Sequence, residues 1–174
     1  MGAGAIQVYI PATLAMLQQL VADGSLWPVN GTAFAVTPKL REAYAEGDDD
    51  ELSDVALREA ALASLRLLAA HDAGGADGPT RPRRVVLAAE VDDVTLRPDL
   101  DDAVVRLAGP VPMDRVIAAY VDNSGAEEAV VRAIEAIDAA DLGDEDADLI
   151  VGDAQDHDLA WYANQELAFL LDLL

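Results

Sequence analysis

The first 24 residues have the pattern of a strand followed by a capped helix, and this unit constrains the fold more than any other part of the chain. Apolar residues alternate with polar or amphipathic ones over residues 5–10, as in a half-buried strand. Pro11 is expected to end the strand. Thr13 can then cap a helix that stops at Gly24. The chain is therefore expected to form a sheet with helices packed on it.

Further strands are indicated by short apolar runs between turn residues. The run at residues 84–91 is almost wholly apolar, as in a strand buried on both faces. Short links in the second half of the chain favour antiparallel pairing there. The other predicted strands are residues 32–36, 103–107 and 116–121. Together with the first unit, they predict an α/β fold whose mixed sheet of about five strands carries packed helices.

Helix signals lie between these strands. Thr37 begins a short helix expected to stop before Gly47, and a longer helix is expected over residues 52–71. Ser124 and Glu127 have the spacing of a capping box that would start a further helix. The apolar run at 149–152 is too short to assign to either class.

The length of the chain predicts one domain. A domain of 174 residues buries roughly 70% of the surface that the unfolded chain exposes, and 52% of the residues are apolar. Residues 72–84 are rich in Gly and Pro, which predicts a flexible loop. They do not mark a domain boundary, because neither flank has enough elements to close a core of its own. We therefore expect residues 1–174 to form a single domain.

The charge of the chain is its most unusual bulk property. Asp and Glu number 33 against 11 Lys and Arg, a net charge of −22. This balance disfavours binding to nucleic acid phosphates and to anionic membranes, and it favours a basic protein partner. The alternative is that the acidity serves solubility alone.

The chain lacks the residues that several classes of protein require. Cysteine is absent from the sequence, which excludes disulfides, thiolate catalysis and cysteine metal sites. Neither a nucleotide-binding glycine motif nor a known hydrolase or kinase signature is present, so no cofactor is expected. The sequence also has no apolar run long enough to span a bilayer and no signal-peptide pattern, so we expect a cytoplasmic protein.

The acidic segment that begins at Asp144 partly resembles a calcium-binding loop. Asp144, Asp146 and Asp148 match the first three ligand positions of an EF-hand loop. Leu149 and Gln155 stand where that loop needs Gly and Glu. The pattern fails, and no metal site is expected.

Chemical groups are densest at residues 155–166. His157 could act as an acid–base residue with Glu166 as its carboxylate partner, in a small hydrolase or transferase whose pocket is lined by Tyr9 or Thr13. A histidine among acidic residues is more often a surface or capping residue, so this pair is a weak catalytic candidate.

The same segment contains an aromatic pair. If it is helical, Trp161 and Tyr162 lie on different faces, so one packs into the core and the other borders the surface. Aromatic and polar residues of this kind also form partner surfaces. The residues expected on such a ligand or partner surface are Tyr9, Thr13, Trp161, Tyr162 and Gln165.

Three sequence blocks carry a resemblance: V-Y-I-P-A-T-L-A-M-L, G-T-A-F-A-V-T-P-K-L-R-E and H-D-L-A-W-Y-A-N-Q-E-L. They resemble an uncharacterised family of short proteins from high-GC actinobacteria, a domain of unknown function. The resemblance covers most of the chain and implies a bacterial cytoplasmic setting. It supplies no reaction, ligand or catalytic residue.

The leading hypothesis is a noncatalytic protein-interaction or regulatory module that uses its acidic surface and the aromatic patch of Trp161 and Tyr162. The alternatives are the small hydrolase or transferase with His157, and a protein that binds a small ligand without turnover.

Overall fold

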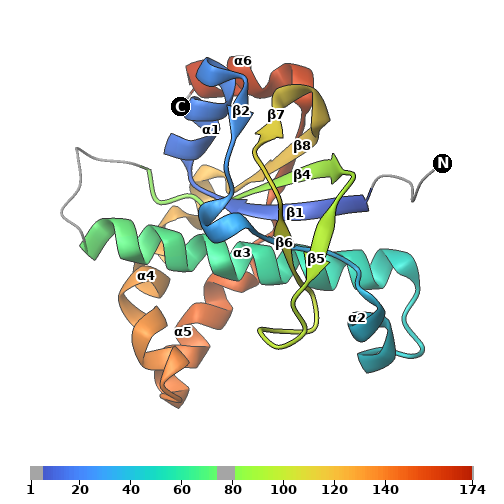
Figure 1. The fold of residues 1–174 in the computed structure, drawn as a ribbon. Helices are drawn as coiled ribbons and strands as arrows, with labels where there is room; N and C mark the ends of the chain where they lie inside the picture. The colour runs from blue at the N-terminus through green and yellow to red at the C-terminus, as the bar shows by residue number, and fades with distance from the viewer. Residues whose placement is uncertain (1–5, 74–80, 174) are drawn as a thin grey trace.

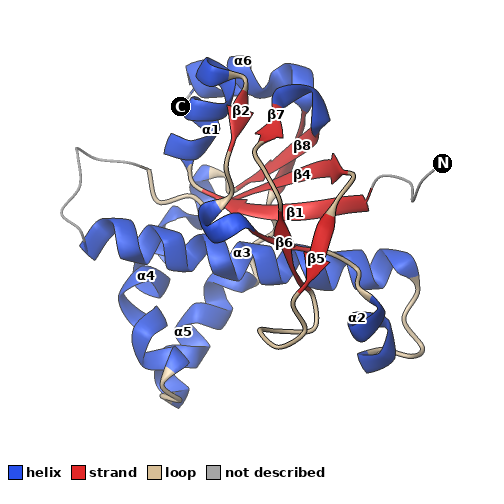
Figure 2. Cartoon of the chain, viewed as in Figure 1, coloured by secondary structure: helices blue, strands red, loops and turns tan. Residues whose placement is uncertain are grey.

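The computed structural model describes residues 6–73 and 81–173 and arranges them in layers around one large sheet (Figures 1 and 2). The sheet has seven strands in the order β5-β6-β3-β1-β4-β8-β9. Their bounds are β1 Ile6–Ala12, β3 Thr32–Phe34, β4 Val85–Val91, β5 Val94–Leu96, β6 Val104–Leu107, β8 Val116–Val121 and β9 Ala160–Ala163. A second, two-stranded sheet pairs β2 (Ser25–Leu26) with β7 (Val111–Pro112).

The prediction of helices packed on a sheet is confirmed, but the sheet itself was predicted wrongly. It has seven strands rather than about five, and every pairing recorded among the described residues is antiparallel rather than mixed. The two edge strands account for the difference in number. β5 has three residues and β9 has four, which is too short for an alternating pattern to show in the sequence.

Helices cover both faces of the sheet. Figure 1 shows α1 and α6 on one side, α3 across the other, and α4 and α5 beyond α3. The helices are α1 Leu14–Asp23, α2 Pro38–Ala43, α3 Asp49–Ala73, α4 Glu127–Asp141, α5 Glu145–Gln155 and α6 Leu167–Leu173. Four 3-10 turns lie at Val29–Gly31, Met113–Arg115, Ser124–Ala126 and Asn164–Glu166. None of the helices in the described ranges is long and apolar enough to cross a bilayer.

The first strand and helix form as expected. Thr13 caps α1, because its hydroxyl accepts a hydrogen bond of 3.2 Å from the Met16 amide. Gly24 ends the helix at a φ of 79°, a left-handed conformation that glycine adopts without strain. Pro11, however, does not end the strand. β1 pairs with β3 only at Tyr9, so at Pro11 the strand has β4 alone as its neighbour and tolerates a residue without an N–H.

The core has three parts among the described residues, and two of them lie on opposite faces of the sheet because the central strands alternate their side chains. In β4, Val85 and Leu87 face the cluster that includes α1 and α6, while Val86 faces the cluster beneath α3. A third cluster joins the C-terminal half of α3, from Leu65 onward, to α4 and α5. α3 is thus the shared support of the sheet on one side and of α4 and α5 on the other.

Some helix boundaries differ from the prediction. The capping box at Ser124 is wrong: Asn123 instead accepts a hydrogen bond of 3.1 Å from Gly125, in a 3-10 turn before α4 begins at Glu127. The unassigned run at 149–152 lies within α5, which Asp144 caps by accepting a 2.9 Å hydrogen bond from Ala147.

The loop predicted over residues 72–84 falls largely outside the described residues, which resume at residue 81. Residues 81–84, the last part of this segment, belong to no helix or strand. Arg83 and Arg84 are buried, at 9% and 1% exposure. Arg84 directly precedes β4 and begins the site described next.

Candidate functional site

A buried ion pair joins Arg84 and Asp122 at one end of the sheet. Val85 pairs with Val121, so these two residues lie opposite each other just beyond β4 and β8. The Arg84 Nε and Nη2 atoms each donate a hydrogen bond of 2.8 Å to the Asp122 carboxylate, and the Arg84 amide donates a third of 2.7 Å. Their side chains are 1% and 0% exposed. Such burial is costly unless both groups are fully hydrogen-bonded, as they nearly are here.

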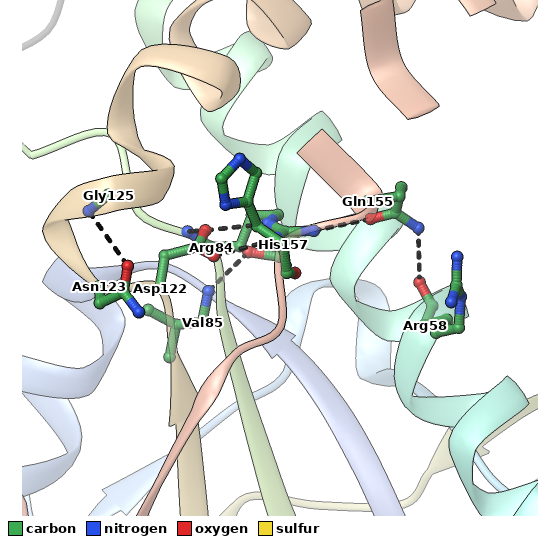
Figure 3. Close-up of polar contacts among 9 residues, drawn as sticks. Arg58, Arg84, Val85, Asp122, Asn123, Gly125, Gln155 and His157 are labelled. Carbon is green, nitrogen blue, oxygen red and sulfur yellow. Dashed lines mark hydrogen bonds and ion pairs between the residues drawn. The ribbon is translucent and has the colours of Figure 1, made fainter. Parts of the chain in front are cut away.

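The rest of the Arg84 guanidinium holds the segment after α5. Nη1 donates to the Gln155 side-chain oxygen at 2.8 Å, and Nη2 donates to the His157 carbonyl at 2.9 Å. The Gln155 amide nitrogen in turn donates to the Arg58 carbonyl on α3 at 3.2 Å. Figure 3 shows Gln155 between the two arginines. Arg84 therefore fixes the α5–β9 connection against the sheet, and Gln155 ties it to α3.

A buried serine makes a second link beside this ion pair. The Ser64 hydroxyl donates to the Ala12 carbonyl at 2.7 Å and accepts from the Val85 amide at 3.0 Å. Ser64 is fully buried and lies on α3, while its partners lie on β1 and β4. The hydroxyl thus satisfies two backbone groups at the strand ends and fixes α3 over them.

A cleft of about 70 Å³ lies between α3 and the α5–β9 connection, with Arg84 among its lining residues. Exposed charged groups of both signs border it: Asp54, Arg58 and Asp158, together with His157. The remaining lining residues are Leu57, Ala61, Gln155 and Leu159. The lining therefore combines guanidinium and carboxylate groups with a few apolar side chains.

His157 and Glu166 lie at opposite ends of β9. The four residues of this strand extend over roughly 10 Å, at about 3.3 Å per residue, and His157 precedes one end while Glu166 follows the other. His157 is exposed, and its carbonyl is the acceptor for Arg84. Glu166 is exposed and accepts a 3.0 Å hydrogen bond from the Ala163 amide. The structure does not bring these two weak catalytic candidates together.

The aromatic pair lies on a strand and not on the helix that the sequence indicated. Successive side chains of a strand point to opposite faces, so Trp161 and Tyr162 are separated by the sheet itself. Tyr162 packs against the cluster that includes α1 and α6, whereas Trp161 is 56% exposed and lies opposite Tyr120. One aromatic faces the core and the other the surface, as expected, although the cause is a different element.

The other predicted surface residues are dispersed. Tyr9 is 5% exposed, lies in the core beneath α3 and accepts a 2.9 Å hydrogen bond from Gln7. Thr13 caps α1, and Gln165 is exposed in the turn after β9. The Tyr9 ring lies 6.4 Å from that of Tyr120. Burial raises the pKa of Tyr120, and the nearby Tyr9 and the charge of Asp54 raise it further.

A strongly acidic surface lies on α4, α5 and the turn between them, which we call the acidic hairpin (residues 127–155). It contains ten Asp or Glu residues and one arginine. Glu127 and Asp141 form ion pairs with Arg83 and Arg66, at 2.8 Å and 2.9 Å, and the other eight form none with a described residue. The hairpin therefore concentrates much of the uncompensated charge of the chain.

The acidic hairpin also exposes large aliphatic residues. Leu142 is 89% exposed and Leu149 is 69% exposed, and Val131 and Ile150 are exposed as well. Asp138 lies four residues before Leu142 and Asp153 four residues after Leu149, so a carboxylate shares the helix face of each leucine. Despite the density of acidic residues, no group of three or more potential metal ligands gathers within the described ranges.

Neither Arg84 nor the acidic hairpin is predicted as a site from the sequence. Arg84 follows a Gly- and Pro-rich stretch, and its partner is 38 residues away. Its only local signal is that an arginine stands directly before an apolar strand and an aspartate directly after another. The acidic hairpin becomes visible only once α5 is known to be a helix, and its apolar run at 149–152 is too short to show this in the sequence.

The sequence model of DUF6912, a family of unknown function, matches residues 6–171 of the chain. Comparisons with curated proteins and with solved structures return no match.

Proposed function

The chain belongs to DUF6912, a family without a known function, and we propose that it is a noncatalytic protein-interaction module whose acidic hairpin binds a basic segment of a partner protein. The observation that carries the proposal is the presence of Leu142 and Leu149, both largely exposed, among eight carboxylates that lack an ion-pair partner in the described chain. This combination suits a partner with both positive charge and apolar side chains.

Each part of the surface has a separate role in this proposal. When a partner covers the exposed leucine and isoleucine side chains, the complex is stabilised by roughly 25 cal/mol per Å² of apolar area buried. The carboxylates attract a basic partner, speed its encounter and disfavour acidic competitors. An amphipathic helix with basic and apolar faces has both complementary features. We therefore propose that the partner segment is of this kind.

Trp161 provides a further apolar contact in the proposal. It lies on β9, the edge strand that follows the hairpin in sequence, and is 56% exposed. Tryptophan is among the residues that most often dominate binding energy at interfaces. Tyr162 packs inward and has only a supporting role.

The proposal includes a bacterial cytoplasmic setting and excludes nucleic acid and membrane partners, because a net charge of −22 opposes anionic surfaces. The alternative is a small hydrolase or transferase that uses His157 and nearby carboxylates, and its pairing of His157 with Glu166 is the weaker part of it, because the two lie at opposite ends of β9.

The test uses a defined probe. A fluorescent helical peptide of leucine and lysine, with leucines on one face, is titrated with the full chain and followed by anisotropy. We expect saturable binding that weakens when salt rises from about 50 mM to about 500 mM, because salt screens the exposed carboxylates. A peptide with glutamate in place of lysine should not bind.

Matched variants locate the binding surface. Leu142→Ser with Leu149→Ser should weaken peptide binding by about tenfold or more, through loss of apolar contact. Leu100→Ser is the control, since Leu100 is 50% exposed but lies outside the hairpin. If the control variant and the hairpin variant bind equally, or if the glutamate peptide binds as well as the lysine peptide, the proposal is wrong.

A further inference from the structure

We propose that the cleft between α3 and the α5–β9 connection binds a small zwitterion of the free α-amino acid type, with one carboxylate and one ammonium group. This site is separate from the solvent-exposed leucines of the acidic hairpin. The inference rests on the donors of Arg84, on the charges that line the cleft and on its size.

One N–H of the Arg84 guanidinium has no recorded acceptor among the described residues. A guanidinium has five N–H donors, and four of those of Arg84 are used: two by Asp122, one by Gln155 and one by the His157 carbonyl. The remaining hydrogen is on Nη1. Arg84 lines the cleft, as does Gln155, the partner of Nη1. The proposal places this donor toward the cleft, where a ligand oxygen would accept its hydrogen bond.

Charged side chains of both signs line the cleft. Arg58 borders it and forms no ion pair with a described residue. With the spare donor of Arg84, it favours a carboxylate, which guanidinium groups bind well. Asp54 and Asp158 border the same cleft and favour an ammonium group. One ligand with both charges would satisfy all four residues.

The net charge of the protein narrows the choice of ligand. A simple anion must approach a chain with a net charge of −22, which opposes its binding. A simple cation is attracted but leaves the arginine donors without an acceptor. A zwitterion has no net charge, so it avoids the long-range repulsion and still forms both kinds of contact.

The size of the cleft limits what it can enclose. Its volume of about 70 Å³ is well below the roughly 300–1,000 Å³ of pockets that hold drug-sized ligands. It therefore suits a compact head group, such as that of an amino acid, rather than a large ligand. Leu57 and Leu159 also line the cleft, so a ligand side chain would lie against them toward solvent.

The test is an NMR titration of the full chain with glycine, with acetate and methylammonium as single-charge probes at equal ionic strength. We expect saturable amide shifts with glycine at Arg58, Gln155 and His157. Acetate and methylammonium should bind about tenfold more weakly or worse, since each makes only half of the contacts. The inference is overturned if glycine causes no saturable shifts, or if acetate or methylammonium alone matches glycine.

Variants at the rim of the cleft leave the ion pair of Arg84 and Asp122 intact. Arg58→Gln and Asp158→Asn should each weaken glycine binding by about tenfold. Arg132→Gln and Asp153→Asn are matched controls, because both residues are exposed and do not line the cleft. Equal glycine binding by the rim and control variants would overturn the inference. The Leu142→Ser, Leu149→Ser variant should bind glycine normally, so this result and that of the peptide test are independent.

Discussion

The Asp122 carboxylate accepts three hydrogen bonds from a single residue, Arg84, and neither side chain is more than 1% exposed. This contact joins β4 to β8 just beyond the last strand pair, Val85 with Val121. The same guanidinium holds Gln155 and the His157 carbonyl. One buried arginine thus joins the sheet to the segment between α5 and β9.

Asp122→Asn should destabilise the fold strongly. It leaves the buried Arg84 charge without its counter-ion, and breaking a buried pair in this way costs about 3–5 kcal/mol. The measurement is the free energy of unfolding in urea. Asp138→Asn, an exposed change on α4, is the control. A loss below about 1 kcal/mol for Asp122→Asn would show that the pair does not hold the fold together.

Ser64→Ala should destabilise the fold by about 2 kcal/mol, because it leaves the Ala12 carbonyl and the Val85 amide without their shared partner. Ser53→Ala is a matched control, since Ser53 lies on the same helix and is only partly buried. Hydrogen exchange adds a local measurement: the Val85 amide should exchange faster in Ser64→Ala than in the wild type. Equal stability of the two variants would contradict the assigned role.

The two aromatics of β9 should respond differently to truncation. Tyr162→Ala should lower the free energy of unfolding by about 2 kcal/mol, since the ring packs against the core. Trp161→Ala should lower it by less than about 0.5 kcal/mol, since the indole is mostly exposed. Chemical denaturation of both variants measures the difference. The opposite order would contradict the placement of the two rings on β9.

Asp141 and Arg66 should show a small pH-dependent coupling. The hydrogen bond from Arg66 lowers the pKa of Asp141 below its usual 3.8. A lowered carboxyl pKa stabilises the folded state above the unfolded pKa, and this contribution is lost as pH falls through the folded pKa. Both groups are more than 40% exposed, so the effect at neutral pH should be about 0.5 kcal/mol. NMR titration of Arg66→Gln should show the Asp141 pKa rising, and an unchanged pKa would contradict the coupling.

Local signals explain what the sequence predicts well. The Thr13 cap and the Gly24 stop are formed by residues within one helix, and the alternation in β1 is read from neighbouring residues. These features need no knowledge of distant contacts. β4 is similarly clear, because a strand at the centre of a sheet is apolar on both faces.

The missed features depend on contacts between distant residues. β9 becomes a strand because it pairs with β8, and its four residues carry too little alternation to outweigh an apparent helix. Arg84 acquires its partners only once β4 and β8 are paired and α5 is in place. The hairpin was missed because α5 combines an acidic first turn with a short apolar run, which separately suggest a solvated loop and an ambiguous segment.

The most direct test of the proposed interaction is to locate the bound basic peptide by NMR on the labelled full chain. The account predicts that the largest amide shifts fall on the acidic hairpin around Leu142 and Leu149, and that they diminish together as salt is raised. Shifts that cluster elsewhere, for example around Leu96 and Leu100 at the β5 edge, would contradict the assignment of the partner surface to the acidic hairpin.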